Sequence, residues 1–329
     1  MRAALIDTPS GIEAVRIADV GIDPPAPTEV QVEVRASSVN FPDILMAEGA
    51  YQVKPPMPFT PGMEGAGTVV AVGAAVKNIK VGDRVLTSLE YGTFAERVNA
   101  PAARCFSIPE AISFEQAAAV GLAYQTAYFA LRERGQMKPD DVVLINGATG
   151  GVGLAAIRLA KAFGTKTVIG SVASLEKKSI VLEAGADAIV DVDTKDRIAS
   201  LKDQVATMSG GRLADLVVES VGGEIFDASL RALAFRGRMV VVGFAGGTIP
   251  TVKANYLLLK NITLSGLQWA LYPSKMTDEV LRAQAEIFDL LARGKLAANI
   301  GATYELGDIR TALGDMKHRR VRGKIVVRI

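Results

Sequence analysis

Apolar and polar positions follow a short period in the first 120 residues of the chain. Apolar side chains recur every second residue in EVQVEVRASSV at 29–39 and form a nearly continuous run in GAGTVVAVG at 65–73. Both patterns are typical of β-strands. Glycine and proline are dense between residues 47 and 73, and KPPMPFTPG at 54–62 predicts a loop. We therefore expect a β-rich domain at 1–120.

A helical period begins at SFEQAAAVGLAYQTAYFALRERG, residues 113–135. Ser113 is expected to cap this helix, with Gln116 at the capping-box position. From residue 140 to about 268, short β-branched runs such as DVVLING alternate with helical segments such as EIFDASLRALAFRG at 224–237. Such alternation predicts a doubly wound parallel sheet, so the fold class is α/β.

The last 61 residues, 269–329, contain one helical segment and end in the β run KIVVRI. A strand at this position needs a partner, so we expect the tail to return to the first domain. The predicted organisation is one domain at 1–120, completed by 269–329, and a second at 121–268.

A glycine-rich turn lies between a predicted strand and a predicted helix, in INGATGGVG at 145–153. Its spacing is A-x-G-x-x-G, with alanine in the first position. The first amides of a helix and its positive dipole end attract anions, and in this setting the usual anion is a dinucleotide pyrophosphate. A tight turn without a ligand remains the alternative. The candidate pyrophosphate residues are Ala148, Gly150, Gly151, Val152 and Gly153.

The end of the second strand indicates which dinucleotide is bound. An NAD-binding protein places a carboxylate there for the ribose 2′-hydroxyl, whereas this chain continues KTVIGSV without one. Ser171, Ser174 and Lys177 instead offer hydroxyl groups and a cation for a 2′-phosphate. We therefore predict NADPH as the cofactor. The alternative is that EKK at 176–178 is only a solvated helix face.

Charge and composition limit the possible partners. Lys and Arg total 37 against 35 Asp and Glu, for a net charge of +2, which argues against a nucleic-acid or membrane partner. The basic segment KHRRVRGK at 317–324 is interpreted first as a solvated turn. The mostly apolar run at 142–157 is too short for a membrane span. MRAALIDTPSG lacks the apolar core of a signal peptide.

The chain has one cysteine, Cys105, and one histidine, His318. A single cysteine allows no internal disulfide, which suits the cytoplasm. These residues are too few for the usual zinc sites, and His318 has no nucleophile signature near it. We expect no bound metal. The chemistry is therefore expected from an organic cofactor or from hydroxyl, amide and carboxylate groups.

Several motifs together resemble the zinc-independent medium-chain dehydrogenase/reductases, in their NADPH:quinone oxidoreductase-like (zeta-crystallin-like) branch. The resemblance spans the whole chain. It implies a GroES-like catalytic domain and a Rossmann NADPH-binding domain. The motifs are VNFPDILMAEGAYQVKPPMPFTPGMEGAGTVVAVG, VGDRVL, NGATGGVGLAAIRLAKAFG, EAGAD, VGGEIFDASLRALAFRGRMVVVG and NYLLLKNITLSG.

The resemblance also implies catalytic residues. Zinc-dependent relatives have a catalytic cysteine where this chain has Asn40, and a histidine where Met63 precedes Glu64. Tyr51 matches a tyrosine that related enoyl reductases use as proton donor, and Asn40 matches a polar residue of the active-site cleft. A phenol or amide N–H can stabilise the negative charge that hydride addition creates. The alternative is that Tyr51 only packs under the loop at 55–61.

Two further family positions bear on these roles. Asp43 matches a family acid, which we interpret as a helix or turn residue. Leu45 stands where quinone reductases often have a second tyrosine, so the preference for quinones stays open.

Further cofactor contacts are implied by the resemblance alone. Thr126 is expected near the nicotinamide and Arg319 near the phosphates, while Val192 replaces a tyrosine that some relatives stack on adenine. Ligands gather at the later strand ends of such sheets, where this chain has Val221, Gly243 and Phe244.

The predicted function is a cytoplasmic, metal-free NADPH-dependent reductase. It would transfer hydride to a quinone or to the C=C bond of an α,β-unsaturated carbonyl. Two alternatives stay open: an enoyl-thioester reductase, or a non-catalytic NADPH-binding protein of the crystallin-like or RNA-binding kind. A homodimer is expected, formed through the edge strand at 261–267.

Overall fold

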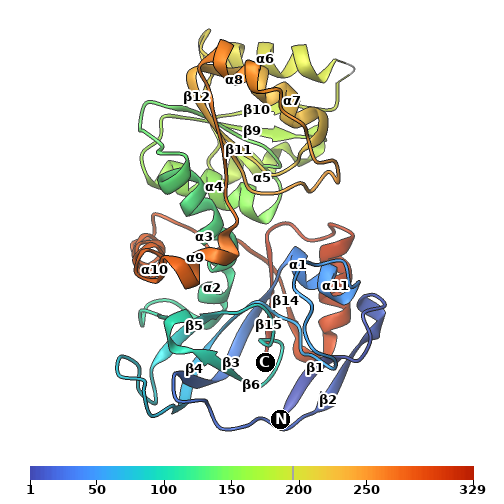
Figure 1. The fold of residues 1–329 in the computed structure, drawn as a ribbon, viewed down its shortest axis with the longest axis vertical. Helices are drawn as coiled ribbons and strands as arrows, with labels where there is room; N and C mark the ends of the chain where they lie inside the picture. Colours follow the sequence, from blue (N-terminus) through green and yellow to red (C-terminus); the bar gives the residue numbers. More distant parts are fainter. Residues whose placement is uncertain (195) are drawn as a thin grey trace. The chain divides into compact units, whose positions relative to one another are not determined.

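The computed structural model describes residues 1–194 and 196–329. The chain forms two compact units (Figure 1). Unit 1 contains Met1–Leu122 and Pro273–Ile329, and unit 2 contains Ala123–Tyr272. The boundaries predicted from the sequence were residues 120 and 268.

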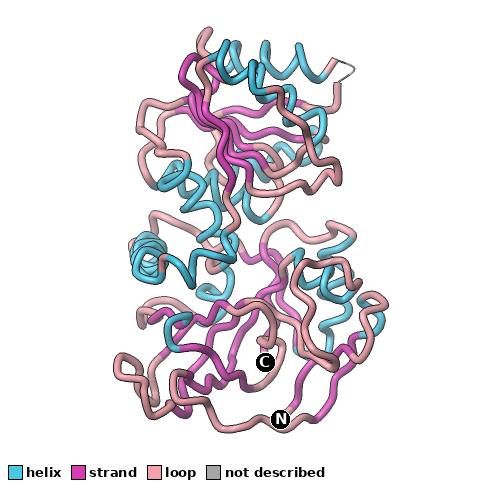
Figure 2. Tube along the Cα trace, in the orientation of Figure 1, coloured by secondary structure: helices cyan, strands magenta, loops and turns pink. Residues whose placement is uncertain are grey.

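Unit 1 is built on a mostly antiparallel sheet with the strand order β14-β15-β3-β4-β5-β7, and β6 also pairs with β3. Strands are drawn in magenta in Figure 2. The last strand, β15, runs antiparallel to β3 and parallel to β14. The strands are β1 (Arg2–Ile6), β2 (Val15–Asp19), β3 (Glu29–Val39), β4 (Glu64–Val72), β5 (Arg84–Ser88), β6 (Arg97–Pro101), β7 (Cys105–Ser107), β14 (Ile300–Glu305) and β15 (Lys324–Arg328). The helices are α1 (Phe41–Ala47), α2 (Phe114–Ala119), α10 (Thr277–Ala292) and α11 (Ile309–Lys317).

Unit 2 contains a fully parallel six-stranded sheet with the order β10-β9-β8-β11-β12-β13. Helices α4 and α5 lie on one face, and α6 and α7 lie on the other (Figure 1). The strands are β8 (Val142–Ile145), β9 (Thr167–Val172), β10 (Ala188–Asp191), β11 (Ala214–Glu219), β12 (Leu233–Val241) and β13 (Thr263–Gly266). The helices are α4 (Gly151–Ala162), α5 (Lys178–Glu183), α6 (Arg197–Met208), α7 (Gly223–Ala232) and α8 (Ala254–Lys260). Two helices lie at the unit boundaries: α3 (Leu122–Tyr128) and α9 (Tyr272–Lys275). The predicted GroES-like and Rossmann α/β architecture is therefore confirmed.

The helix predicted at 113–135 is wrong as a single element. Its start is as expected, since the Gln116 amide donates to Ser113 Oγ at 3.2 Å. The helix ends at Ala119, and Gly121 then lies so close to the Glu64 carboxylate that a Cβ there would overlap it. That carboxylate accepts the Leu122 amide at 2.6 Å and so begins a new helix, α3, which continues as a π-helix over Phe129–Arg134.

The helix predicted at 224–237 also ends early, at Ala232. Lys260 caps its last carbonyls, since Nζ donates to Leu230 O at 3.1 Å and to Arg231 O at 2.9 Å. Leu233 then adopts an extended backbone and pairs with Ala214 of β11. The apolar residues that follow belong to β12 rather than to the helix.

The sequence predicts no membrane-spanning segment, and the helices of the structure bear on this prediction. Among residues 1–194 and 196–329, no helix combines the length and apolar character that crossing a bilayer requires.

Candidate functional site

The glycine-rich segment forms the predicted turn between β8 and α4. Gly147 has a left-handed backbone, with φ of 64°, which turns the chain out of the sheet. Gly150 is the N-cap of α4, and no side chain caps the helix or places an acid in its first turn. The positive end of the α4 dipole is therefore not neutralised within the helix itself.

The glycines of this turn are required for different reasons. A Cβ on Gly153 would overlap the Gly147 carbonyl oxygen and lie 2.8 Å from the Ala148 Cα, so helix packing requires glycine there. A Cβ on Gly150 would meet only the Gly147 oxygen at 3.3 Å, and one on Gly151 only the Ala123 Cβ at 3.8 Å. Both residues are exposed. Packing leaves Gly151 free to carry a side chain and restricts Gly150 only at the Gly147 oxygen, which would have to shift slightly. The surface that both glycines leave bare is suited to the close approach of a ligand.

Ala148 departs from the glycine spacing at no cost to packing. It is fully buried, and it faces Gly170 of β9, where a Cβ would lie only 3.0 Å from the Ala148 Cβ. A Cβ on Gly170 would also overlap Val181 Cγ1, so glycine at this position makes room for both the Val181 and the Ala148 side chains.

The predicted 2′-phosphate residues lie at the end of β9 and on the turn that follows it. Ser171 is 3% exposed within the strand, and its carbonyl accepts the Ala148 amide at 3.3 Å. Ser174 and Lys177 are half-buried on the next turn, where the Lys177 amide donates to Ser174 O at 3.1 Å. The structure thus brings Ser174 and Lys177 together on one turn, and Ser171 connects the preceding strand to the glycine turn.

The ends of β11 and β12 lie at the same carboxyl edge of the sheet as the glycine turn. Val221 is half-buried, and its carbonyl accepts the Gly246 amide at 2.8 Å. Gly243 is half-buried and Phe244 is 39% exposed. Parallel α/β sheets bind ligands at this edge. Thr126 lies on α3, one turn beyond the Ala123 that faces the glycine turn.

Asn40 of unit 1 lies in a buried polar network. It is 6% exposed at the start of α1. Its side-chain Nδ2 donates to Glu64 Oε1 at 2.8 Å and to Ser38 O at 3.2 Å. Its Oδ1 accepts from Lys324 Nζ at 2.8 Å, and the same ammonium lies 3.0 Å from Glu64 Oε1. Both amide N–H groups of Asn40 are therefore engaged within the protein.

Tyr51 lies just beyond the other end of α1. Its amide and that of Ala50 donate to Leu45 O, at 3.2 and 2.7 Å. The half-buried ring packs against the apolar cluster that contains Phe59. Burial raises the pKa of the Tyr51 phenol above its ordinary value, and the nearby charge of Asp43 adds to the effect. The phenol therefore stays protonated at neutral pH.

Asp43 fixes the start of the same helix. It is fully buried, and it accepts the Asn40 amide at 2.7 Å and the Gly62 amide at 3.1 Å. This geometry agrees with its interpretation as a helix residue. Burial raises the pKa of Asp43 to about 7, although both amide donors act in the opposite direction.

Arg319 follows α11 with a left-handed backbone, φ 55°, which is unfavourable for a residue with a side chain. The Arg319 amide donates to Met316 O at 3.1 Å and the Arg320 amide to Asp315 O at 2.9 Å, as in a helix C-cap where glycine is usual. Its side chain is exposed. Strained residues of this kind are concentrated at functional sites.

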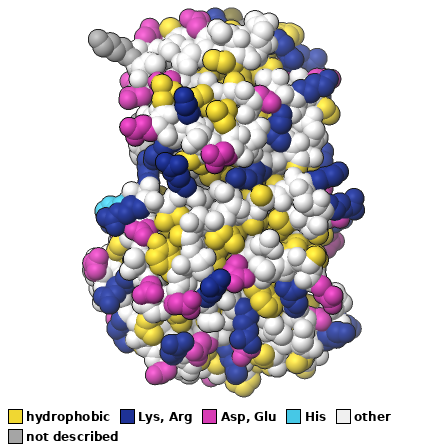
Figure 3. Space-filling model, turned by 180° about the vertical axis from the view of Figure 1, so that it is seen from behind, with side chains coloured by type: hydrophobic (Ala, Val, Ile, Leu, Met, Phe, Trp, Pro, Cys, Tyr) yellow, Lys and Arg dark blue, Asp and Glu magenta, His cyan; other side chains and the backbone are white. Residues whose placement is uncertain are grey.

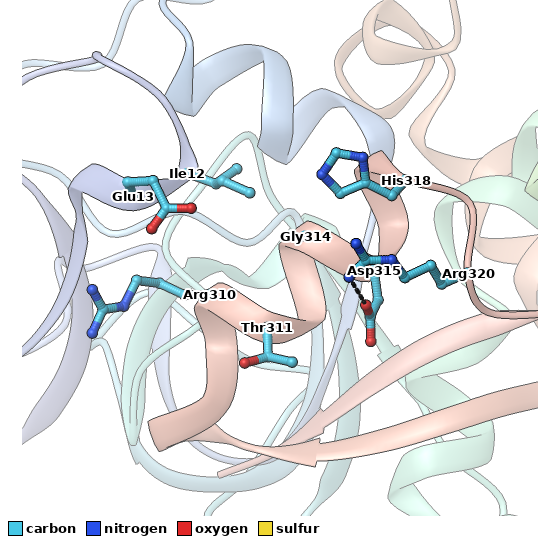
Figure 4. Close-up of a pocket in the computed structure, with 8 residues that line it drawn as sticks. All are labelled: Ile12, Glu13, Arg310, Thr311, Gly314, Asp315, His318 and Arg320. Atoms are coloured by element: carbon cyan, nitrogen blue, oxygen red, sulfur yellow. Dashed lines mark hydrogen bonds and ion pairs between the residues drawn. The ribbon is translucent and has the colours of Figure 1, made fainter.

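A separate pocket lies between the turn at Ile12–Ala14 and α11 (Figure 4). Acids and bases both line it, and Arg320 pairs with Asp315 at 3.2 Å. No single charge would select a ligand there, and the lining contains none of the predicted site residues. The lining residues are Ile12, Glu13, Arg310, Thr311, Gly314, Asp315, His318 and Arg320.

Sequence reasoning missed the buried charged residues that bond to the segments on which the candidate site residues lie. Glu64 and Lys324 form a buried ion pair although they are 260 positions apart. Glu219 is a fully buried carboxylate at the end of an apolar strand. The available signal was a charged residue at the end of a mostly apolar strand, because such a charge needs a partner when it is buried.

Comparisons with known proteins give consistent matches along the chain. Residues 26–110 match the family model described as alcohol dehydrogenase GroES-like domain, and residues 151–286 match the one described as zinc-binding dehydrogenase. The chain is 37% identical over 311 residues to quinone oxidoreductase-like protein 2 of Bos taurus, covering 94% of this chain and 88% of that protein.

Solved structures agree with these matches. A mycobacterial quinone oxidoreductase superposes with a TM-score of 0.91 at 31% identity, covering 100% of both chains. An Escherichia coli quinone oxidoreductase complexed with NADPH gives a TM-score of 0.90 at 32% identity, also over 100% of both chains.

Proposed function

The chain belongs to the quinone oxidoreductase branch of the medium-chain dehydrogenase/reductases, and from this membership we propose that it is a metal-free, NADPH-dependent reductase. The observation that carries the proposal is the bare backbone at Gly150 and Gly151, next to an uncapped helix N-terminus. Metal-free chemistry is supported by the sequence, since one cysteine and one histidine cannot supply the usual zinc ligands.

We assign the pyrophosphate to the first turn of α4 and the 2′-phosphate to the turn after β9. The pyrophosphate residues are Gly150, Gly151, Val152 and Gly153, and the 2′-phosphate residues are Ser171, Ser174 and Lys177. Ala148, also predicted for the pyrophosphate, is fully buried, so we assign it to the support of the turn. Thr126, Val221, Gly243 and Phe244 complete the proposed nucleotide contacts at the carboxyl edge of the sheet.

Replacing Lys177 with alanine is expected to weaken NADPH binding about tenfold or more and to leave NADH binding almost unchanged. A hydrogen bond to a charged group contributes about 1.5–3 kcal/mol, and only NADPH carries the 2′-phosphate. Calorimetric titration with both nucleotides measures the difference. Lys178→Ala is a matched control, because Lys178 is the exposed neighbour of Lys177 and carries the same charge. Equal losses for NADPH and NADH would remove Lys177 from the phosphate site.

Replacing Arg319 with glycine is expected to stabilise unit 1 and to weaken NADPH binding. Glycine relieves the left-handed backbone strain, which costs about 1 kcal/mol or more in a residue with a side chain. The same change removes the guanidinium that we assign to the cofactor phosphates. Thermal denaturation and nucleotide titration report the two effects separately. A variant with higher stability and unchanged affinity would show that Arg319 has no part in binding.

When bound, NADPH supplies a hydride to the electron-poor carbon of the acceptor. The acceptor oxygen then gains negative charge, which Tyr51 stabilises or protonates through its phenol. Asn40 was predicted as a second donor, but its N–H groups already bond to Glu64 and Ser38. We therefore assign Asn40 to the support of the site and the proton to Tyr51.

An acceptor screen tests this proposal. Purified protein is mixed with NADPH or NADH and with 1,2-naphthoquinone, an α,β-unsaturated ketone or crotonyl thioester, and nucleotide oxidation is followed at its absorbance band. Turnover with NADPH and a quinone or ketone supports the proposal. Turnover with the thioester alone would favour an enoyl-thioester reductase. Tight NADPH binding without turnover of any acceptor would favour a binding protein.

We also propose that two copies of the chain associate through unit 2. β13 is one of the two edge strands of the sheet, and α8, which precedes it in the chain, buries none of its residues. Leu258 is 77% exposed and Leu259 is 75% exposed, with Phe235 of β12 also exposed. Open strand edges and apolar patches favour pairing across a two-fold axis. Sedimentation velocity would distinguish a dimer from a single chain.

We place the protein in the cytoplasm and its partner among small molecules. The single buried cysteine suits a reducing compartment. On the face shown in Figure 3, basic and acidic side chains are interspersed, which gives little support to a nucleic-acid partner.

A further inference from the structure

Glu219 is the last residue of β11, and it is fully buried at the carboxyl edge of the unit 2 sheet. Its Oε1 accepts the amides of Val221 at 2.6 Å and Gly222 at 2.8 Å. The carboxylate therefore folds the start of the β11–α7 turn back onto the strand. A buried carboxylate is costly, so these hydrogen bonds offset a large desolvation penalty.

The second oxygen of Glu219 connects this turn to the glycine turn. Glu219 Oε2 accepts a hydrogen bond from Asn146 Nδ2. Asn146 is the residue after β8 and directly precedes Gly147, and its Nδ2 also lies 2.6 Å from Ser229 Oγ of α7. Its carbonyl accepts the Ser220 hydroxyl at 3.0 Å. The start of the glycine turn is thus held by β11 and α7.

The β11–α7 turn in turn holds the loop that follows β12. The Ala245 amide donates to Ser220 O at 2.9 Å, and the Gly246 amide donates to Val221 O at 2.8 Å. The Gly223 amide donates to Thr248 O at 3.1 Å. A movement of the β11–α7 turn would therefore displace the loop that carries Gly243 and Phe244.

We propose that Glu219 is a positioning residue, whose carboxylate holds the three nucleotide loops at 147–153, 220–223 and 243–248 in one arrangement. The proposal rests on the assignment of these loops to NADPH. Glu219 itself is buried and its oxygens bind protein donors, so it acts through the loops and not on the nucleotide. Burial also raises the pKa of Glu219, which agrees with a carboxylate that has no cation among its hydrogen-bond partners.

Exchanging the carboxylate of Glu219 and the amide of Asn146 tests the connection between Glu219 and the glycine turn. Glu219→Gln keeps an oxygen for the Val221 and Gly222 amides but offers an NH2 group to Asn146. The Asn146 amide must then turn its Oδ1 toward that group, which takes its Nδ2 away from Ser229 Oγ and leaves the Nδ2 buried where Oδ1 has no partner. Asn146→Asp sets two carboxylates together. The double variant restores one donor and one acceptor. We expect each single variant to weaken NADPH binding at least about tenfold, and the double variant to recover to within about threefold of the wild-type Kd.

A control variant distinguishes an effect on the position of the loops from a general loss of protein stability. Asp141→Asn breaks the buried pair with Arg238 at the amino end of β8, on the opposite edge of the sheet. It is expected to lower the melting temperature and to leave the NADPH Kd unchanged when titrated well below that temperature. Folded Glu219→Gln protein with a wild-type Kd, or a double variant without recovery, would overturn the role of Glu219.

Amide exchange of the free protein decides the inference independently of the cofactor. Glu219→Gln is expected to speed exchange in all three loops, whereas Asp141→Asn should leave them unchanged. Unchanged loop exchange in Glu219→Gln would overturn the inference. A wild-type protein that binds no NADPH would instead overturn the proposed function.

Discussion

Gly150→Ala is expected to weaken NADPH binding about ten- to hundredfold in a protein that still folds. Gly150 has an extended backbone, φ −82° and ψ 169°, which alanine adopts without strain. Its new methyl group would meet only the Gly147 oxygen at 3.3 Å. The same methyl would stand between the backbone and the pyrophosphate. Overpacking costs about 1–3 kcal/mol, which corresponds to an increase of about ten- to hundredfold in Kd.

Gly153→Ala provides the contrast for this prediction. Its methyl group would overlap backbone atoms of Gly147 and Ala148, which cannot move without opening the turn between β8 and α4. We expect a loss of about 3 kcal/mol or more from unit 2, visible in thermal denaturation before any nucleotide is added. A Gly150→Ala protein that binds NADPH as the wild type does would place the pyrophosphate elsewhere. A loss of stability equal to that of Gly153→Ala would show that Gly150 serves the fold.

The turn itself was predictable because its signals are local. Strand, glycine turn and helix follow one another within about twenty residues, and each has its own period or residue preference. The alanine at position 148 is a departure from the motif that the sequence did not explain. Its explanation is Gly170 on the neighbouring strand, which makes room for the extra methyl group. Such an exchange is visible only when the pairing of β8 with β9 is known.

Helix ends were harder to predict than helix positions. The break at Gly121 depends on Glu64, and the end of α7 depends on Lys260. Both are contacts between residues distant in sequence, whereas a helical period reports only the local face. Local helix propensity therefore predicted that both helices continue past the residues at which tertiary contacts end them.

The buried polar network of unit 1 could not be predicted from the sequence for the same reason. Family resemblance indicated Asn40 but not its partner Lys324, which comes from the last strand. The hydrogen bonds of this network engage the Asn40 amide within the protein. Of the two donors predicted from the sequence, we therefore propose Tyr51 for the acceptor. The sequence could predict which residue types lie near the site, but hydrogen-bond partners decided what each of them is free to do.

Replacing Tyr51 with phenylalanine is expected to lower turnover of an α,β-unsaturated ketone about 100-fold or more, because general acid catalysis contributes about 10²–10⁴ in rate. NADPH affinity should stay unchanged, since we assign no cofactor contact to the phenol. The ring remains to pack against the apolar cluster around Phe59, so the melting temperature should shift little.

Tyr91→Phe is a matched control for this variant. Tyr91 is also half-buried against the same cluster, and its ring meets that of Phe59 edge to face at 6.0 Å. Loss of its hydroxyl should leave turnover unchanged. If both variants slowed turnover equally, the effect would come from packing, and Tyr51 would not be the proton donor.

The pH profile adds a test of the assigned proton. Burial and the charge of Asp43 raise the pKa of Tyr51 above its ordinary value of about 10. The donor therefore keeps its proton as pH rises through neutrality, and turnover should decline only where the phenol ionises, above about pH 10. The Tyr51→Phe protein should lack this alkaline decline. A wild-type profile that falls between pH 7 and 9 in the same way in both proteins would assign the proton to another group.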